Sequence, residues 1–216
     1  EVELYDPALN LLDSEFATQC NNDHGISRDG TQLVLSDSSE VCESCIYTLP
    51  YVGGAPKRVT NNTPSYWHGW SPDGAELAYV GKRAAGTFQV FTIKAKGGAE
   101  TQLTLDFDHC DGPDYTPDGR WIWFNGERNG QVDLYRMRPD GTELERMTED
   151  ELVNWFPHPD PTGTALVYLA YPKGTTGHPA GKDVTLNLMS PNGGRAEPVV
   201  ALFCGQGTIN VPSWAP

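Results

Sequence analysis

The chain contains the stretch Ser71-Pro72-Asp73-Gly74, and the same kind of turn returns as Thr116-Pro117-Asp118-Gly119. Weaker copies are Ser-Arg-Asp-Gly at 27–30 and Asp-Pro-Thr-Gly at 160–163. The glycines at 30, 74, 119 and 163 are therefore 44, 45 and 44 residues apart. In such turns proline presets φ, aspartate accepts hydrogen bonds from the turn backbone, and glycine adopts a positive φ. Their near-equal spacing indicates an internal structural repeat.

Two runs rich in β-forming residues follow each turn. In the second repeat they are 76–80 and 89–93, and in the third repeat they are 120–124 and 133–137. A glycine turn such as Gly97-Gly98 and a short polar run come next. With the run that precedes the turn, each repeat has four short strands, which is the pattern of one propeller blade.

The sequence therefore predicts an all-β fold, a β-propeller of four-stranded blades of about 44 residues each. We expect one domain over residues 1–216 because no interior linker is visible. The predicted blades are at about 21–64, 65–108, 109–152 and 153–204.

The two ends of the chain, 1–20 and 205–216, are interpreted as blade remnants that share a fifth blade. Residues 2–5 are predicted to be its third strand, 11–16 its fourth and 210–214 its first. About five blades are then present, in a shortened or incomplete form of a six-bladed ring.

The formal net charge of −14 excludes several classes of partner. Nucleic-acid binding needs a surplus of Lys and Arg on one face, so we expect no nucleic-acid partner. No apolar run reaches the roughly 18 residues that a membrane helix needs, so we expect no membrane insertion. Binding of cations is compatible with this acidity.

The five cysteines include one Cys-x-x-Cys motif, Cys42 to Cys45. A structural zinc site normally needs a second such pair, so a loop disulfide and two plain thiols are the alternatives that remain. No glycine-rich phosphate loop precedes a helical pattern, and we expect no nucleotide cofactor.

Several strings beside the turns are similar to those of TolB-type propeller repeats, and the resemblance extends over essentially the whole chain. They are 21–25, 65–70, 111–115, 154–158 and 206–210. The resemblance implies a propeller, usually of six or more blades, and favours a periplasmic or secreted location. TolB itself is a periplasmic protein-binding partner, whereas oligogalacturonate lyases with the same blades hold a metal in the central channel. Fold alone does not decide between these functions.

The repeat predicts a cluster of polar residues at one mouth of the channel. His24 and His68 each lie six residues before a turn glycine, and Asp114 and His158 each lie five before one. Because the first strand of each blade lines the channel, we expect these side chains to lie on one ring.

His24, His68, His158 and Gln206 form a set like that of the lyase relatives, which implies a divalent metal such as Zn²⁺, Mn²⁺ or Ca²⁺. The alternative is that these histidines only bind the backbone of neighbouring blades. The predicted ligand-binding residues are Asp23, His109, Asp111, Asp114, Asn210, Arg128, His178 and Trp155.

Three functional hypotheses follow. The first is a TolB-like binding module with a ligand or metal at the histidine-lined mouth, where a small anionic ligand or a protein partner docks. The second is a metal-dependent lyase or hydrolase acting on an anionic substrate, a sugar acid or a phosphate ester. The third is a structural fragment that completes its ring by forming a homo-oligomer.

Overall fold

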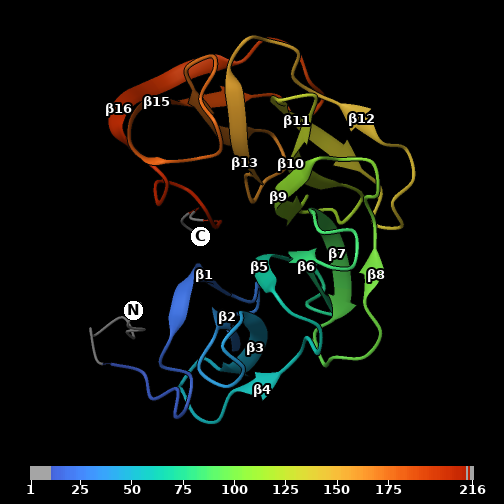
Figure 1. The fold of residues 1–216 in the computed structure, drawn as a ribbon, viewed down its shortest axis with the longest axis vertical. Coiled ribbons are helices and arrows are strands. Elements are labelled where there is room, and N and C mark those ends of the chain that lie inside the picture. Colours follow the sequence, from blue (N-terminus) through green and yellow to red (C-terminus); the bar gives the residue numbers. More distant parts are fainter. Residues whose placement is uncertain (1–10, 213, 215–216) are drawn as a thin grey trace.

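The computed structural model describes residues 11–212 and 214, which form four antiparallel sheets of four strands each, all in sequence order (Figure 1). The first sheet consists of β1 (Cys20–Ile26), β2 (Gln32–Asp37), β3 (Cys45–Pro50) and β4 (Lys57–Arg58). The second consists of β5 (Ser65–Trp70), β6 (Glu76–Lys82), β7 (Phe88–Lys94) and β8 (Thr101–Gln102).

The other two sheets follow the same plan. The third consists of β9 (His109–Tyr115), β10 (Ile122–Arg128), β11 (Gln131–Met137) and β12 (Glu145–Arg146). The fourth consists of β13 (Val153–Pro159), β14 (Leu166–Tyr171), β15 (Ala180–Met189) and β16 (Glu197–Gly205).

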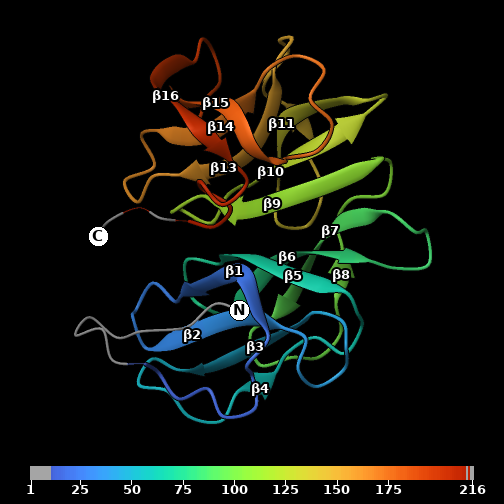
Figure 2. The ribbon, with the colours of Figure 1, turned by 60° about the vertical axis from the view of Figure 1, so that its left-hand side comes forward.

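Each sheet packs against the next through the first strand of the later sheet. Strands β1, β2 and β3 contact β5, strands β5 to β7 contact β9, and strands β9 to β11 contact β13. The sheets thus follow one another around a common axis, as Figures 1 and 2 show. The fold is a four-bladed all-β propeller.

The prediction of about five blades in a shortened or incomplete six-bladed ring is wrong. Strand β16 pairs with β15 and completes the fourth sheet without help from the other end of the chain. Residues 210–212 and 214 lie outside any strand, and residues 11–16 form a loop rather than a strand of their own. Residues 2–5, predicted to be a third strand, lie outside the described residues.

The loop of residues 11–16 instead covers the outer side of the first blade. The amide of Gly54 donates to the carbonyl oxygen of Asp13 at 2.8 Å. The ring of Phe16 lies edge-on to that of Tyr47, with 5.6 Å between the centroids. These contacts bury apolar surface of the first blade, and they use the loop as a cover rather than as part of a sheet.

The repeated turn forms as its sequence predicts. In the second blade the carboxylate of Asp73 accepts hydrogen bonds from the hydroxyl of Ser71 at 2.7 Å and from the amide of Ala75 at 3.0 Å. Gly74 has a φ of 69°, which strains any residue with a Cβ. The turn joins the first and second strands of the blade.

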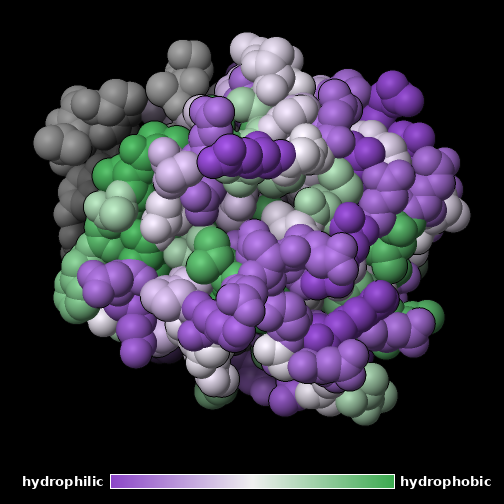
Figure 3. All heavy atoms as spheres, turned by 90° about the horizontal axis from the view of Figure 1, so that it is seen from above, coloured by the Kyte–Doolittle hydropathy of each residue, from purple (hydrophilic) through white to green (hydrophobic). Residues whose placement is uncertain are grey.

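Hydrophilic residues cover most of the face shown in Figure 3. No helix long and apolar enough to cross a membrane occurs within the described part of the chain. All five cysteines are free; Cys42 is exposed and Cys45 is buried, so the Cys-x-x-Cys motif is present as two thiols.

Candidate binding site at the propeller axis

A cavity of about 300 Å³ lies at the axis, where the first strands begin. Its walls come from the first strands β1, β5, β9 and β13, from β6 and β7, and from two segments that follow the second and fourth strands of the last blade. The polar side chains that line it belong to Asn21, Asn22, Asp23, Tyr66, His68, His109, Asp111, His178, Gln206 and Asn210.

Asp111 is the centre of the charged groups in this cavity. Its Oδ1 lies 2.8 Å from Nε2 of His68, and its Oδ2 lies 3.5 Å from Nε2 of His178 and 3.9 Å from Nε2 of His109. The three histidines come from β5, from the loop between β14 and β15, and from β9. One buried carboxylate therefore joins residues that are far apart in the chain.

His68 and Asp111 form an ion pair at neutral pH. Burial by itself lowers the pKa of His68, but the Asp111 carboxylate and its hydrogen bond outweigh burial and raise this pKa to about 9. Burial likewise disfavours the charged form of Asp111, yet His68 and the neighbouring histidines hold its pKa well below the usual range. Burial lowers the pKa of His178, although Asp111 acts in the opposite direction.

Asp23 is the second carboxyl group in the cavity. Burial raises its pKa to about 6; Asp111 adds to this shift and His68 opposes it. Within the described chain, the Asp23 carboxylate has no cation within salt-bridge distance. A buried carboxylate without a counter-ion is costly, and groups of this kind are concentrated at functional sites.

We expect Asp23→Asn to raise the free energy of unfolding by about 1–3 kcal/mol at pH 8. Because the folded-state pKa of Asp23 lies above its unfolded value of about 3.9, the parent loses stability as the pH rises from about 4 to 6. Above about pH 6 the parent keeps this lower stability, whereas the variant does not lose stability in this way because asparagine carries no charge. At pH 4 the two proteins should differ little.

Urea unfolding at pH 4 and pH 8 measures this effect. The exposed Asp106, changed to asparagine, is the matched control and should alter neither value. Equal stability of Asp23→Asn and parent at pH 8 would show that Asp23 bears no burial penalty.

The structure does not bring the predicted metal ligands together. His68 and Gln206 line the axial cavity, but His24 and His158 are not among the residues that line it. Nδ1 of His158 lies 3.2 Å from Oδ2 of Asp114 and its Nε2 lies 2.7 Å from the carbonyl oxygen of Ile209, so both ring nitrogens are occupied. Nδ1 of His24 is buried without a hydrogen-bond partner in the described chain.

The residues present do not fit a metal centre. Across residues 11–212 and 214, no group of three or more His, Cys, Asp or Glu side chains has a geometry that could hold a metal ion. In the axial cavity the Asp111 carboxylate, which would have to coordinate such an ion, already binds His68 at 2.8 Å.

Of the remaining predicted ligand residues, five line the cavity: Asp23, His109, Asp111, His178 and Asn210. The other three, Asp114, Arg128 and Trp155, are not among its lining residues. Asp114 binds His158, as described above. The Arg128 guanidinium lies over the ring of Phe107, 3.9 Å from its centroid.

Trp155 is fully buried and supports the site from behind. Its ring centroid lies 4.5 Å from that of His178 and 5.9 Å from that of His109. Trp155 therefore packs against two histidines of the cavity and is not among the residues that line it.

The sequence places Tyr66 near the channel mouth, and Tyr66 lines the cavity, as expected for a residue two positions before His68 on the same strand face. The predicted site did not include Asn21, Asn22, Val80, Phe88 and Phe156, which also line the cavity. Phe88 begins a third strand, and nothing in the repeat marks that position as axial.

Four blades around an axis, with a polar cavity where their first strands begin, define a β-propeller with an axial site. Residues 68–216 match the family model of the TolB beta propeller domain. The chain belongs to this family, which confirms the resemblance noted from its turns.

Two further comparisons agree with this assignment. The uncharacterized protein Atu1656 of Agrobacterium fabrum is 47% identical over 211 residues, which cover 98% of this chain and 72% of that protein. The structure of "putative TolB from Agrobacterium tumefaciens" has a TM-score of 0.93 at 47% identity, with 97% of this chain and 75% of that chain covered.

TolB from Acinetobacter baumannii has a TM-score of 0.65 at 19% identity, with 87% of this chain and 44% of that one covered. At this level of identity the likeness shows the fold alone.

Proposed function

We propose that this TolB-like propeller is a binding module whose axial cavity holds a ligand with an organic ammonium group. The observation that carries the proposal is Asp23, a buried carboxyl group that faces the cavity without a counter-ion in the described chain. A cationic group placed beside it would supply the missing charge and recover part of the cost of burial.

The charge balance of the cavity favours a cation over the anionic ligand that the sequence suggested. His68 neutralises Asp111, and burial lowers the pKa of His178, which disfavours a charge on that imidazole. Asp23 is then the net charge that a ligand meets. An anion would face this carboxylate with no unpaired cation to compensate.

Two aromatic rings strengthen the same preference. Tyr66 and Phe88 line the cavity, with their ring centroids 5.9 Å apart and their planes inclined by 56°. Aromatic faces attract ammonium groups, by about 0.5–2 kcal/mol according to desolvation. A cavity lined by a carboxylate and two aromatic rings is therefore suited to a lysine-like side chain.

The test uses two tripeptides with blocked ends, acetyl-Gly-Lys-Gly-amide and acetyl-Gly-Glu-Gly-amide. We expect the lysine peptide to raise Tm and to release heat on titration, and the glutamate peptide to do neither, because a ligand stabilises the native state that binds it. Binding should strengthen between pH 5 and 7 as Asp23 loses its proton.

Asp23→Asn should abolish the response to the lysine peptide, and Asp106→Asn should leave it intact. Equal responses to both peptides, or an unchanged response in Asp23→Asn, would contradict the proposal. Mn²⁺ and Zn²⁺ are added in separate titrations, since a rise in Tm that His68→Ala removes would point to a metal ligand instead.

A further inference from the structure

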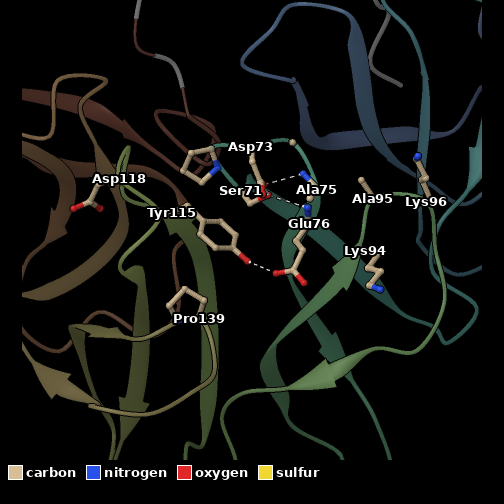
Figure 4. A pocket seen from close by; sticks show the side chains of 13 residues that line it. Ser71, Asp73, Ala75, Glu76, Lys94, Ala95, Lys96, Tyr115, Asp118 and Pro139 are labelled. Carbon is tan, nitrogen blue, oxygen red and sulfur yellow. Dashed lines mark hydrogen bonds between the residues drawn. The ribbon is translucent and has the colours of Figure 1, made fainter.

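A second cavity, of about 820 Å³, lies between the second and third blades (Figure 4). The turn at 71–76 forms one wall, the end of β7 forms another, and Tyr115 and Pro139 of the third blade close it. Because this turn follows the last residue of β5 whereas the axial site lies at the start of that strand, the two cavities are at opposite ends of the first strands.

The residues that border this hollow differ from those at the equivalent positions of the neighbouring junctions. The position of Tyr115, four residues before a turn glycine, holds Trp70 in the second blade, where the indole is buried in the core. The position of Glu76, two residues after a turn glycine, holds Trp121 in the third blade. There Trp121 packs beneath the guanidinium of Arg138 at 3.9 Å. A tryptophan thus occupies one of these two positions at each neighbouring junction, whereas here the positions hold Tyr115 and Glu76.

The cavity presents a carboxylate and two ammonium groups. The hydroxyl of Tyr115 donates to Oε2 of Glu76 at 3.5 Å, a long contact that leaves the carboxylate able to accept more (Figure 4). Lys94 is the direct partner of Glu76 across the β6–β7 pair. Neither Lys94 nor Lys96 has a carboxylate within 4.0 Å in the described chain, and both are exposed.

The other acidic side chains at the cavity are already engaged. Asp73 accepts hydrogen bonds from its own turn, as described above, and the carboxylate of Asp118 accepts from the hydroxyl of Thr116 at 2.6 Å and from the amide of Arg120 at 3.0 Å. These bonds lower the pKa of both carboxyl groups and orient them toward their own turns. Glu76, Lys94 and Lys96 are therefore the charged groups that a ligand can use.

We propose that this cavity binds a short peptide through its free amino and carboxylate ends. Glu76 accepts hydrogen bonds from the ammonium group, and Lys94 and Lys96 bind the carboxylate. The rings of Tyr115, Pro72 and Pro139 provide apolar walls for the side chains of the ligand. The volume lies within the range of about 300–1,000 Å³ that small-ligand sites show.

The experiment titrates the intact protein with tri-leucine in three forms: with free ends, with an acetylated amino end, and with an amidated carboxyl end. Isothermal calorimetry should show binding of the free form. Blocking either end should weaken binding about tenfold or more, because each block removes a charged hydrogen-bonding group.

Two variants assign the ends. In Glu76→Gln, acetylation should no longer weaken binding, whereas amidation still should. In the double variant Lys94→Met, Lys96→Met the pattern should reverse. Because the axial site is also proposed to bind an ammonium group, all titrations are repeated in Asp23→Asn. In that variant the three forms should keep the same order of affinity, so that failure of the axial proposal leaves this one standing.

Three results would overturn the inference. The parent could bind none of the three forms, or it could bind all three equally. Alternatively, the Glu76 and lysine variants could weaken every form to the same degree, which would indicate a general change of the surface rather than recognition of the two ends.

Discussion

Replacement of Asp111 with alanine should lower the free energy of unfolding by about 3–5 kcal/mol at pH 6, the cost of removing one partner from a buried ion pair. The Asp111 carboxylate lies 2.8 Å from Nε2 of His68, whose side chain is only 3% exposed. Without it, His68 has to remain charged in a buried site or lose its proton. Urea unfolding of both proteins measures the difference.

The pH dependence of the pair gives a second measurement. The folded-state pKa of His68, about 9, lies above its unfolded value. The stability that His68 contributes to the folded state is therefore complete below about pH 6.5 and is lost as the pH rises through 9. The folded-state pKa of Asp111 is depressed, so its contribution is lost only in acid.

The parent should therefore lose stability between pH 6 and pH 10 through this pair, and Asp111→Ala should lack that part of the loss. The exposed Asp106, changed to alanine, serves as the control at both pH values. A cost below about 1 kcal/mol at pH 6 would mean that the pair behaves like an exposed one.

Replacement of Trp67 with alanine should cost about 3–5 kcal/mol, the range for loss of a large aromatic side chain from a core. Its indole is 2% exposed and lies in a cluster with Val34 and Ile46 of the first blade and Leu77 of the second. The ring therefore joins two blades, and its removal leaves a cavity between them. Val52→Ala, at a side chain that is 84% exposed, should change stability by less than about 0.5 kcal/mol.

A double-mutant cycle with Gly25 sharpens this test. A Cβ at Gly25 would lie 2.2 Å from the Trp67 ring, so Gly25→Ala should cost about 1–3 kcal/mol in the parent. In the Trp67→Ala background the ring is absent and the added methyl group has room, so Gly25→Ala should no longer lower stability. Additive costs would show that Trp67 does not pack against Gly25.

The spacing of the turn glycines was enough to predict the blades, because each turn has its own local cause in proline, aspartate and glycine. The number of blades could not be obtained in this way. Short β-rich runs at 2–5, 11–16 and 210–214 resemble strands, but pairing needs a partner edge, and β16 already completes the fourth sheet.

The candidate site was predictable in its location and partly in its membership. The repeat predicted His68 at the channel mouth, with Asp23 and Asp111 nearby, and all three line the axial cavity. It placed His24 there as well, since His24 and His68 are equidistant from their turns. The pairing of β5 with β6 shifts register between Trp67 and Gly69, at His68, whereas the pairing of β1 with β2 shifts register between Cys20 and His24. Such a shift changes the face on which a side chain lies, so the two histidines lie differently. The spacing of the turns does not reveal it.

Local signals therefore determined the all-β character and the blade period, since a turn or an alternating strand depends on neighbours a few residues away. The axial ion pair, the unpaired Asp23 and the hollow beside Glu76 were decided only when the blades packed together. Each depends on the distance between side chains from different blades, and neither spacing nor composition encodes such a distance.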